Sequence, residues 1–193
     1  MPANDIGDDG KFRRECSMSR AWLERFDCTV VLDAYAMGAV DTKAPGRANV
    51  VLTPHAGEMA HLTGLPKEAV AAEARARARA ASDAWHAGVV LKGATTWIAF
   101  PGEPDWRHGG GDVGLATSGS GDTLAGLVGG LAARGVALLD AALWGVRLHA
   151  LAGERLAARH GRLGYLAREL GEEVPAAMHT LCSDQAPDGP PSS

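Results

Sequence analysis

The sequence predicts a single α/β domain with a mostly parallel sheet, and three observations lead to this fold class. Four short apolar runs indicate strands, at residues 28–33, 48–53, 88–93 and 95–100. The first three place valine and leucine side by side without polar alternation, which is typical of strands buried on both faces. Helix-forming segments lie between and after these runs, and strands that alternate with helices favour a layered α/β fold.

Two predicted helices follow the second strand. Residues 56–63 form a helix of one or two turns, and residues 67–87 form a long helix rich in Ala, Glu and Arg, which are strong helix formers. The apolar stripe of the long helix consists of Val70, Ala74, Ala78, Ala81 and Trp85. We interpret its charged run as a solvated face, formed by Arg75, Arg77 and Arg79.

The second half of the chain begins with a predicted hairpin, because only a Gly-Ala turn separates the third and fourth strands. Three helices are then expected, over residues 122–134, 139–160 and 164–172. The last should stop before Pro175, since proline cannot continue a helix without losing a backbone hydrogen bond. We expect residues 18–26 to form a further short helix before the first strand.

The composition excludes several classes of protein. The net charge of −4 does not favour a surface for nucleic acids or membranes, and no apolar run has the roughly 20 residues that span a bilayer. The cysteines are odd in number and far apart, so they indicate neither a disulfide framework nor a zinc site, and they are Cys16, Cys28 and Cys182. We therefore expect a cytoplasmic protein.

The chain divides into three predicted parts. Residues 1–17 form an irregular N-terminal segment, residues 18–182 form the folded domain, and residues 183–193 form a disordered tail rich in Pro, Ser and Asp. No repeat or internal linker interrupts the domain.

The segment GLATSGSGDTLAG, residues 114–126, predicts an anion site. Gly119 and Gly121 allow successive backbone N–H groups to point at one place, and the helix that follows adds its partial positive charge. Asp122 has two interpretations, a helix-capping acid, which the pattern alone favours, or a functional carboxylate. The spacing excludes both a Walker A loop and a nucleophile elbow.

Three other strand ends carry polar residues, where ligands of open α/β sheets bind. His55 fits a solvated loop residue, and no acid completes a metal site with His61. Lys92 ends the third strand, and residues 93–96 fit either a plain hairpin turn or a loop that binds a nucleotide. Asp33 ends the first strand and fits a ligand crevice or a turn cap equally well.

Taken together and in this order, the motifs resemble the ADP/ATP-dependent NAD(P)H-hydrate dehydratase family of the ribokinase-like superfamily. The matching stretches span residues 30 to 178 and include VLDAYAM, LTPHAGEMAHLTG, VVLKGATTWIA, GLATSGSGDTLAGLVGGLAARG, WGVRLHALAGE and GYLARELGEEVPAAM. TPHAGE and ATSGSGDTLAG together are specific, whereas GSGD alone indicates only the superfamily. The resemblance implies a ribokinase-like three-layer α/β/α fold, truncated at its N-terminal side, because nothing before residue 30 resembles the family's first strands.

The family returns NADHX and NADPHX, the hydrated forms of NADH and NADPH, to the intact cofactors. The resemblance implies that ADP or ATP, with Mg²⁺, phosphorylates the misplaced hydroxyl and that phosphate then leaves. Asp122 would accept the hydroxyl proton, while the amides of Gly119, Ser120 and Gly121 would stabilise the transferring phosphoryl group. His55 and Asp122 would bind the substrate. The residues that would bind the nucleotide are Lys92, Gly93, Ala94, Thr95, Thr96 and Gly121. A homo-oligomer is also implied.

Four positions depart from the family pattern. Tyr35 replaces an acid, Ala56 replaces a proline, and Asp112-Val113 replaces Asn-Pro. Ser118 replaces a glycine, which would cost roughly 1–2 kcal/mol if that position requires a positive φ. Two alternatives therefore stay open beside the dehydratase: a ribokinase-like kinase for a small metabolite, and a truncated, non-catalytic fragment that binds nucleotides.

Overall fold

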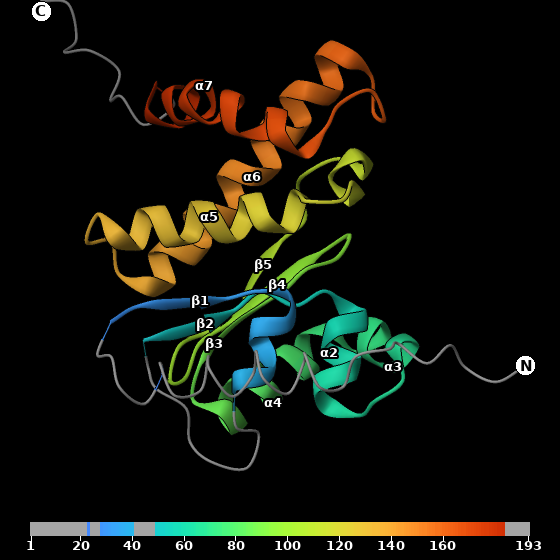
Figure 1. The fold of residues 1–193 in the computed structure, drawn as a ribbon, viewed down its shortest axis with the longest axis vertical. Helices are drawn as coiled ribbons and strands as arrows, with labels where there is room; N and C mark the ends of the chain where they lie inside the picture. The colour runs from blue at the N-terminus through green and yellow to red at the C-terminus, as the bar shows by residue number, and fades with distance from the viewer. Residues whose placement is uncertain (1–22, 24–27, 41–48, 184–193) are drawn as a thin grey trace, which may run out of the picture.

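The chain forms three layers, with helices on both faces of a five-stranded sheet (Figure 1). The residues that the computed structural model describes are 23, 28–40 and 49–183. The predicted irregular segment 1–17, all of the predicted helix 18–26 except Leu23, and the predicted tail from residue 184 onward lie outside them.

The strands follow one another across the sheet in chain order. Strands β1 (Val30–Leu32), β2 (Val50–Leu52) and β3 (Gly88–Leu91) are parallel. Strand β4 (Thr96–Ala99) pairs antiparallel with β3, which confirms the predicted hairpin, and β5 (Trp106–His108) pairs antiparallel with β4. Only β4 therefore runs against the other described strands, and the predicted mostly parallel sheet is confirmed. Strand β5 was not predicted.

Successive side chains of the sheet point to opposite faces, and each face has its own core. Leu52 and Leu91 join the core beneath the sheet, whereas Val51 and Val90 join the core above it, and all four are buried. This explains why the strands lack polar alternation, since both of their faces are covered by helices.

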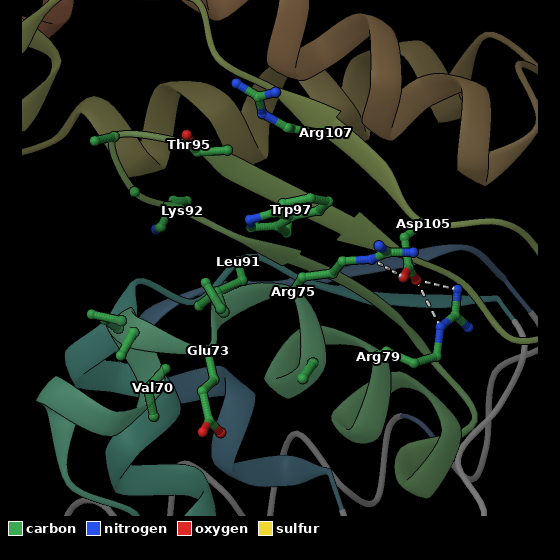
Figure 2. Close-up of a pocket in the computed structure, with 17 residues that line it drawn as sticks. Val70, Glu73, Arg75, Arg79, Leu91, Lys92, Thr95, Trp97, Asp105 and Arg107 are labelled. Atoms are coloured by element: carbon green, nitrogen blue, oxygen red, sulfur yellow. Dashed lines mark hydrogen bonds and ion pairs between the residues drawn. The ribbon is translucent and has the colours of Figure 1, made fainter.

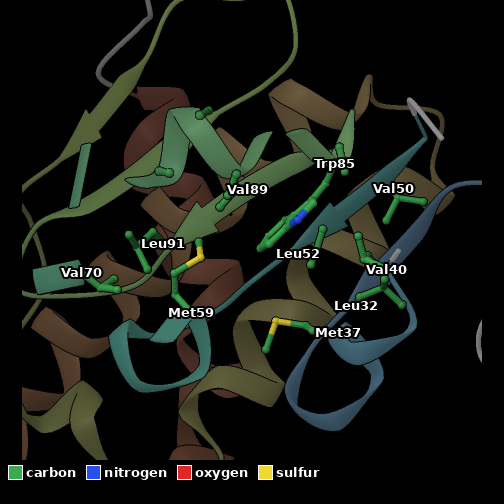
Figure 3. Close-up of a cluster of buried hydrophobic side chains, with 14 residues drawn as sticks. Leu32, Met37, Val40, Val50, Leu52, Met59, Val70, Trp85, Val89 and Leu91 are labelled. Carbon is green, nitrogen blue, oxygen red and sulfur yellow. The ribbon is translucent and has the colours of Figure 1, made fainter. Parts of the chain in front are cut away.

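The lower layer consists of short elements. They are the 3₁₀ helix η1 (Ala34–Ala39) and the helices α2 (Ala56–Thr63), α3 (Lys67–Ala72) and α4 (Ala74–Trp85). Their buried side chains, among them Met37, Met59 and Trp85, pack against the strands (Figure 3). The predicted stripe of the long helix is confirmed, since Val70 and Ala78 are fully buried.

The predicted continuous helix over residues 67–87 is wrong, because the chain breaks between α3 and α4 at Glu73, where φ is −118° and ψ is 33°. The interpretation of its arginines as a solvated face is also wrong in part. Arg75 and Arg79 both bind the carboxylate of Asp105, through nitrogen–oxygen distances of 2.8 Å and 2.7 Å. Arg79 also donates to the carbonyl of Phe100, so it ties α4 to the loop between β4 and β5.

The upper layer consists of α5 (Ser120–Ala133) and α6 (Leu138–His160), extended by α7 (Leu170–Ser183). Two 3₁₀ turns, η2 (Val113–Ala116) and η3 (Ala167–Glu169), precede α5 and α7 respectively. None of the helices in the described part of the chain is both long and apolar enough to cross a membrane.

The prediction that the last helix spans residues 164–172 and stops before Pro175 is wrong. Helix α7 begins at Leu170 and continues through Pro175 to Ser183. Tertiary contacts outweigh the hydrogen bond that proline removes. The buried carboxylate of Glu173 pairs with Arg155 and Arg159 on α6, and this holds the two helices together.

Helices α5 and α6 approach closely at a glycine. A Cβ atom on Gly145 would lie 2.7 Å from Cγ2 of Val128, whereas one on Gly126 would meet no atom within 4 Å. We expect Gly145→Ala to lower the free energy of unfolding by about 1–3 kcal/mol through overpacking. The control Gly126→Ala should raise it by about 0.5–1 kcal/mol through helix propensity. Urea unfolding measures both, and equal effects of the two variants would contradict this packing.

Candidate functional site

The carboxyl ends of the three parallel strands meet at one edge of the sheet. Asp33 follows β1, Thr53 follows β2 and Lys92 follows β3. The backbone N–H of Lys92 donates to the carbonyl of Pro54 at 2.7 Å, so the loops after β2 and β3 stay side by side. The parallel register therefore brings together side chains that are up to 59 residues apart in sequence.

Asp33 lies at the centre of this edge. Its Oδ1 accepts a hydrogen bond from the hydroxyl of Thr53 at 2.7 Å and another from Nζ of Lys92 at 3.2 Å. Lys92 Nζ also lies 3.8 Å from Glu58 Oε2. The side chains of Asp33 and Lys92 are only 15% and 20% exposed, so solvent screens this ion pair weakly.

The first turn of α5 lies directly against the ion pair. A Cβ atom on Gly121 would lie 2.9 Å from Nζ of Lys92 and 3.5 Å from Oδ2 of Asp33. Gly119, the N-cap of α5, has a φ of 86°, and no side chain caps the helix. The predicted anion loop and the ends of β1 and β3 thus form one site.

Asp122 is the third residue of α5, and its side chain does not cap the helix because Gly119 occupies the N-cap. The residue is exposed, and within the described part of the chain its carboxylate accepts no hydrogen bond. An acid in the first turn is favourable for the helix dipole, yet both of its oxygens stay available to a ligand.

His55 is not merely a solvated loop residue. It is the N-cap of α2, where its Nδ1 accepts hydrogen bonds from the backbone N–H groups of Gly57 and Glu58, both at 3.0 Å. The side chain of Glu58 accepts in return from the N–H of His55 at 2.7 Å, which completes a capping box. Because Nδ1 accepts, the proton of the neutral ring is on Nε2, and that N–H can donate to a ligand.

Three of the four family departures have local explanations. Ala56 is the first residue of α2, a position that proline favours but does not require. Asp112 caps η2 by accepting from the N–H of Gly114 at 3.0 Å, as the asparagine it replaces could. The predicted cost of Ser118 does not arise, because the residue with positive φ is Gly119. Tyr35 is exposed.

A different non-glycine residue next to the site does adopt the left-handed region. Ala34, which follows Asp33 directly, has a φ of 48°. This conformation costs an L-residue about 1–2 kcal/mol, so the backbone beside the ion pair is strained.

Three residues of the site were not predicted, namely Thr53, Glu58 and His149. Nε2 of His149, on α6, lies 2.9 Å from the hydroxyl of Ser120 and 3.0 Å from its carbonyl oxygen. Burial and the nearby charge of Lys92 lower the pKa of His149 to about 4, with burial the larger cause. The sequence signal was a histidine within an otherwise apolar helical stretch, LHALAG, which alone fits a packed side chain.

A pocket lies next to this site and shares Lys92 with it. It has a volume of about 880 Å³ and lies between the α3–α4 segment and the hairpin of β3 and β4 (Figure 2). Trp97 forms part of its wall, with the guanidinium of Arg75 5.7 Å from the ring centre. The pocket shares residues 92–95 with the predicted nucleotide loop, but none of residues 119–122 lines it.

The comparisons with known proteins identify the family. The sequence profile of the NAD(P)H-hydrate dehydratase family matches residues 17–176. The chain belongs to this family. The ADP-dependent (S)-NAD(P)H-hydrate dehydratase of Xanthomonas campestris is 51% identical over 82% of this chain and 55% of its own length. The enzyme of the same description from Neisseria meningitidis is 40% identical over 80% of this chain and 53% of its own.

Solved structures confirm the ribokinase-like fold. The ADP/ATP-dependent NAD(P)H-hydrate dehydratase from Bacillus subtilis, co-crystallised with ATP and Mg²⁺, superposes with a TM-score of 0.73 at 33% identity, over 81% of this chain and 56% of that one. A ribokinase-like superfamily protein from Enterococcus faecalis gives 0.73 at 25% identity, over 93% and 62%. The chain thus spans about half the length of the curated dehydratases it matches.

The glycine at the start of α5 is a test of the anion loop. Gly119→Ala should lower the free energy of unfolding by about 1–2 kcal/mol, because alanine resists its φ of 86° and a Cβ atom would lie 3.3 Å from that of Ala167. The control Ser118→Gly should change it by no more than about 1 kcal/mol. Urea unfolding measures both free energies. A rise of more than about 1 kcal/mol in Ser118→Gly would show that Ser118 is the strained residue.

The lowered pKa of His149 makes stability depend on pH. In the unfolded chain the ring binds its proton near pH 6.5 and in the folded chain only near 4, so acidification through this window favours unfolding. The free energy of unfolding should fall by up to about 3 kcal/mol between these values. The variant His149→Gln should not show this pH-dependent fall. Parallel curves of the free energy of unfolding against pH, from pH 8 to 4, for wild type and variant would refute the prediction.

Proposed function

We propose that this chain provides the phosphoryl-transfer site of an NAD(P)H-hydrate dehydratase, which returns NADHX and NADPHX to NADH and NADPH with ADP or ATP as phosphoryl donor. The observation that carries the proposal is the Asp33–Lys92 ion pair placed against Gly121 at the first turn of α5. Membership of the family supports it, and so do the names of the relatives.

The first turn of α5 fits a phosphate group. Helix N-termini carry unpaired backbone N–H groups and a partial positive charge, and here no side chain caps them. The ammonium of Lys92, paired with Asp33, lies within reach of the same place. The amides of residues 119–121 would therefore stabilise charge on the group being transferred, as oxyanion sites do. Residues 92–96 would bind the rest of the nucleotide.

Asp122 and His55 would serve the second substrate. Among the described residues nothing hydrogen-bonds the carboxylate of Asp122, which lies beside the amides, so it would accept the proton of the hydroxyl as phosphorylation proceeds. The Nε2–H of His55 would donate a hydrogen bond to the hydrated nicotinamide cofactor, since its other nitrogen is occupied in the capping box.

The described residues include no group of three His, Cys, Asp or Glu side chains arranged to hold a metal ion. Mg²⁺ keeps several waters and binds through one or two carboxylates and the phosphates of its substrate. When bound with the nucleotide, the ion would neutralise charge on the phosphate oxygens.

Two coarser expectations belong to the same proposal. A cytoplasmic location agrees with the free thiols of Cys28 and Cys182. A homo-oligomer agrees with large apolar side chains that stay exposed in the single chain, among them Trp144, Leu163 and Met178. Light scattering after size exclusion would measure the mass of the assembly, and a monomer would refute the second expectation.

Turnover tests the proposal directly. The purified chain should restore the absorbance of the reduced nicotinamide when hydrated NADH is mixed with Mg²⁺ and ADP or ATP. Asp122→Asn should lower the rate by about 10²–10⁴-fold, because the amide cannot accept the proton, while ADP affinity by calorimetry changes only a few-fold. The matched control is Asp140→Asn, an exposed acid in the first turn of α6.

The possible outcomes separate the alternatives. A folded chain that binds nucleotide but gives no turnover with either donor would favour the non-catalytic fragment. A phosphorylated product that accumulates without losing phosphate would favour the small-metabolite kinase. Hydroxyethylthiazole kinase from Pyrococcus horikoshii superposes with a TM-score of 0.68 at 19% identity, and this likeness shows only that the fold is shared.

A further inference from the structure

A histidine of α6 contacts the first turn of α5. Nε2 of His149 lies 2.9 Å from the hydroxyl of Ser120 and 3.0 Å from the carbonyl oxygen of the same residue. A carbonyl oxygen only accepts, so Nε2 carries the proton of the ring. Ser120 is 3% exposed, which places this contact on the inner side of the turn, away from solvent.

The turn needs such a support because its own residues constrain it weakly. Glycine on both sides of Ser120 leaves the backbone free to adopt other conformations, and no side chain caps the helix. The hydroxyl of Thr123 reaches the carbonyls of Gly119 and Ala167, but only at 3.3 Å and 3.4 Å. His149 makes the shorter contacts and belongs to a 23-residue helix with a buried face.

The charge state of His149 suits this task. Lys92 already supplies a positive charge at the turn, and burial together with that charge keeps the imidazole neutral near pH 7. A neutral ring donates through Nε2 without adding a second cation beside the Lys92–Asp33 ion pair. His149 can thus orient the amides without adding a charge to the site.

We propose that His149 is a positioning residue of the anion site: its Nε2–H bond to Ser120 orients the amides of residues 119–121 toward the phosphate that they bind. The proposal rests on the function proposed above as far as the phosphate is concerned. The orientation of the turn can be measured without any nucleotide. The role belongs to the N–H donor, so a side chain with a donor and one without should behave differently.

Two substitutions separate the donor from the packing. His149→Gln can place an N–H close to where Nε2 lies, whereas His149→Leu fills similar space with no donor. The control is His160→Leu, an exposed histidine at the end of the same helix. We expect His149→Leu to speed amide hydrogen exchange over residues 119–123 about tenfold, the effect of one lost hydrogen bond, while His149→Gln and His160→Leu stay within about threefold of wild type.

Calorimetry with ADP gives the functional readout. His149→Leu should weaken ADP binding about tenfold, and His149→Gln should restore most of it. If the wild-type chain binds no ADP, the proposed function fails while the exchange experiment still decides the role of His149. Unchanged exchange in His149→Leu, or equal effects of Leu and Gln, would overturn the proposal.

A measurement on the wild-type chain covers the case in which His149→Leu does not fold. The ¹⁵N chemical shifts of the His149 ring report which nitrogen carries the proton. We expect the Nε2–H form at pH 7 and its persistence on addition of ADP. A proton on Nδ1 would remove the donor that the proposal requires and would overturn it.

Discussion

The ion pair between Asp33 and Lys92 is the interaction on which the rest of the site depends. Both charges are largely withdrawn from solvent, and removing Lys92 would leave the carboxylate of Asp33 without its positive partner. Thr53 completes the pair by donating to the same carboxylate. Because these residues end three adjacent parallel strands, the register of the sheet itself determines where the charges lie.

The helical layer above the sheet brings the other half of the site to this pair. Gly121 has no side chain, and that absence allows the first turn of α5 to lie against Lys92. Helix α6 sets the position of α5 in two ways, through the close approach of Gly145 to Val128 and through the contact of His149 with Ser120. Two layers with separate hydrophobic cores thus meet at one site.

Much of this could be predicted from residues at strand ends. Asp33, His55 and Lys92 each follow a buried run, and parallel strands necessarily bring such positions to one edge. Thr53 and His149 could not be found in this way, because a threonine after a strand and a histidine in a helix acquire their roles only from contacts 20 and 29 residues away. The predicted helix end before Pro175 was wrong for the same reason. The ion pairs of Glu173 with α6 outweigh the local tendency of proline to end a helix.

The left-handed conformation of Ala34 joins this site to the stability of the whole chain. Ala34, immediately after Asp33, is held at φ 48°, a backbone conformation that glycine adopts without strain. Glycine there would relax the backbone, but it would also widen the range of directions in which the neighbouring carboxylate can point. Alanine at this position therefore costs the chain some backbone strain and in return narrows the directions open to the carboxylate of Asp33.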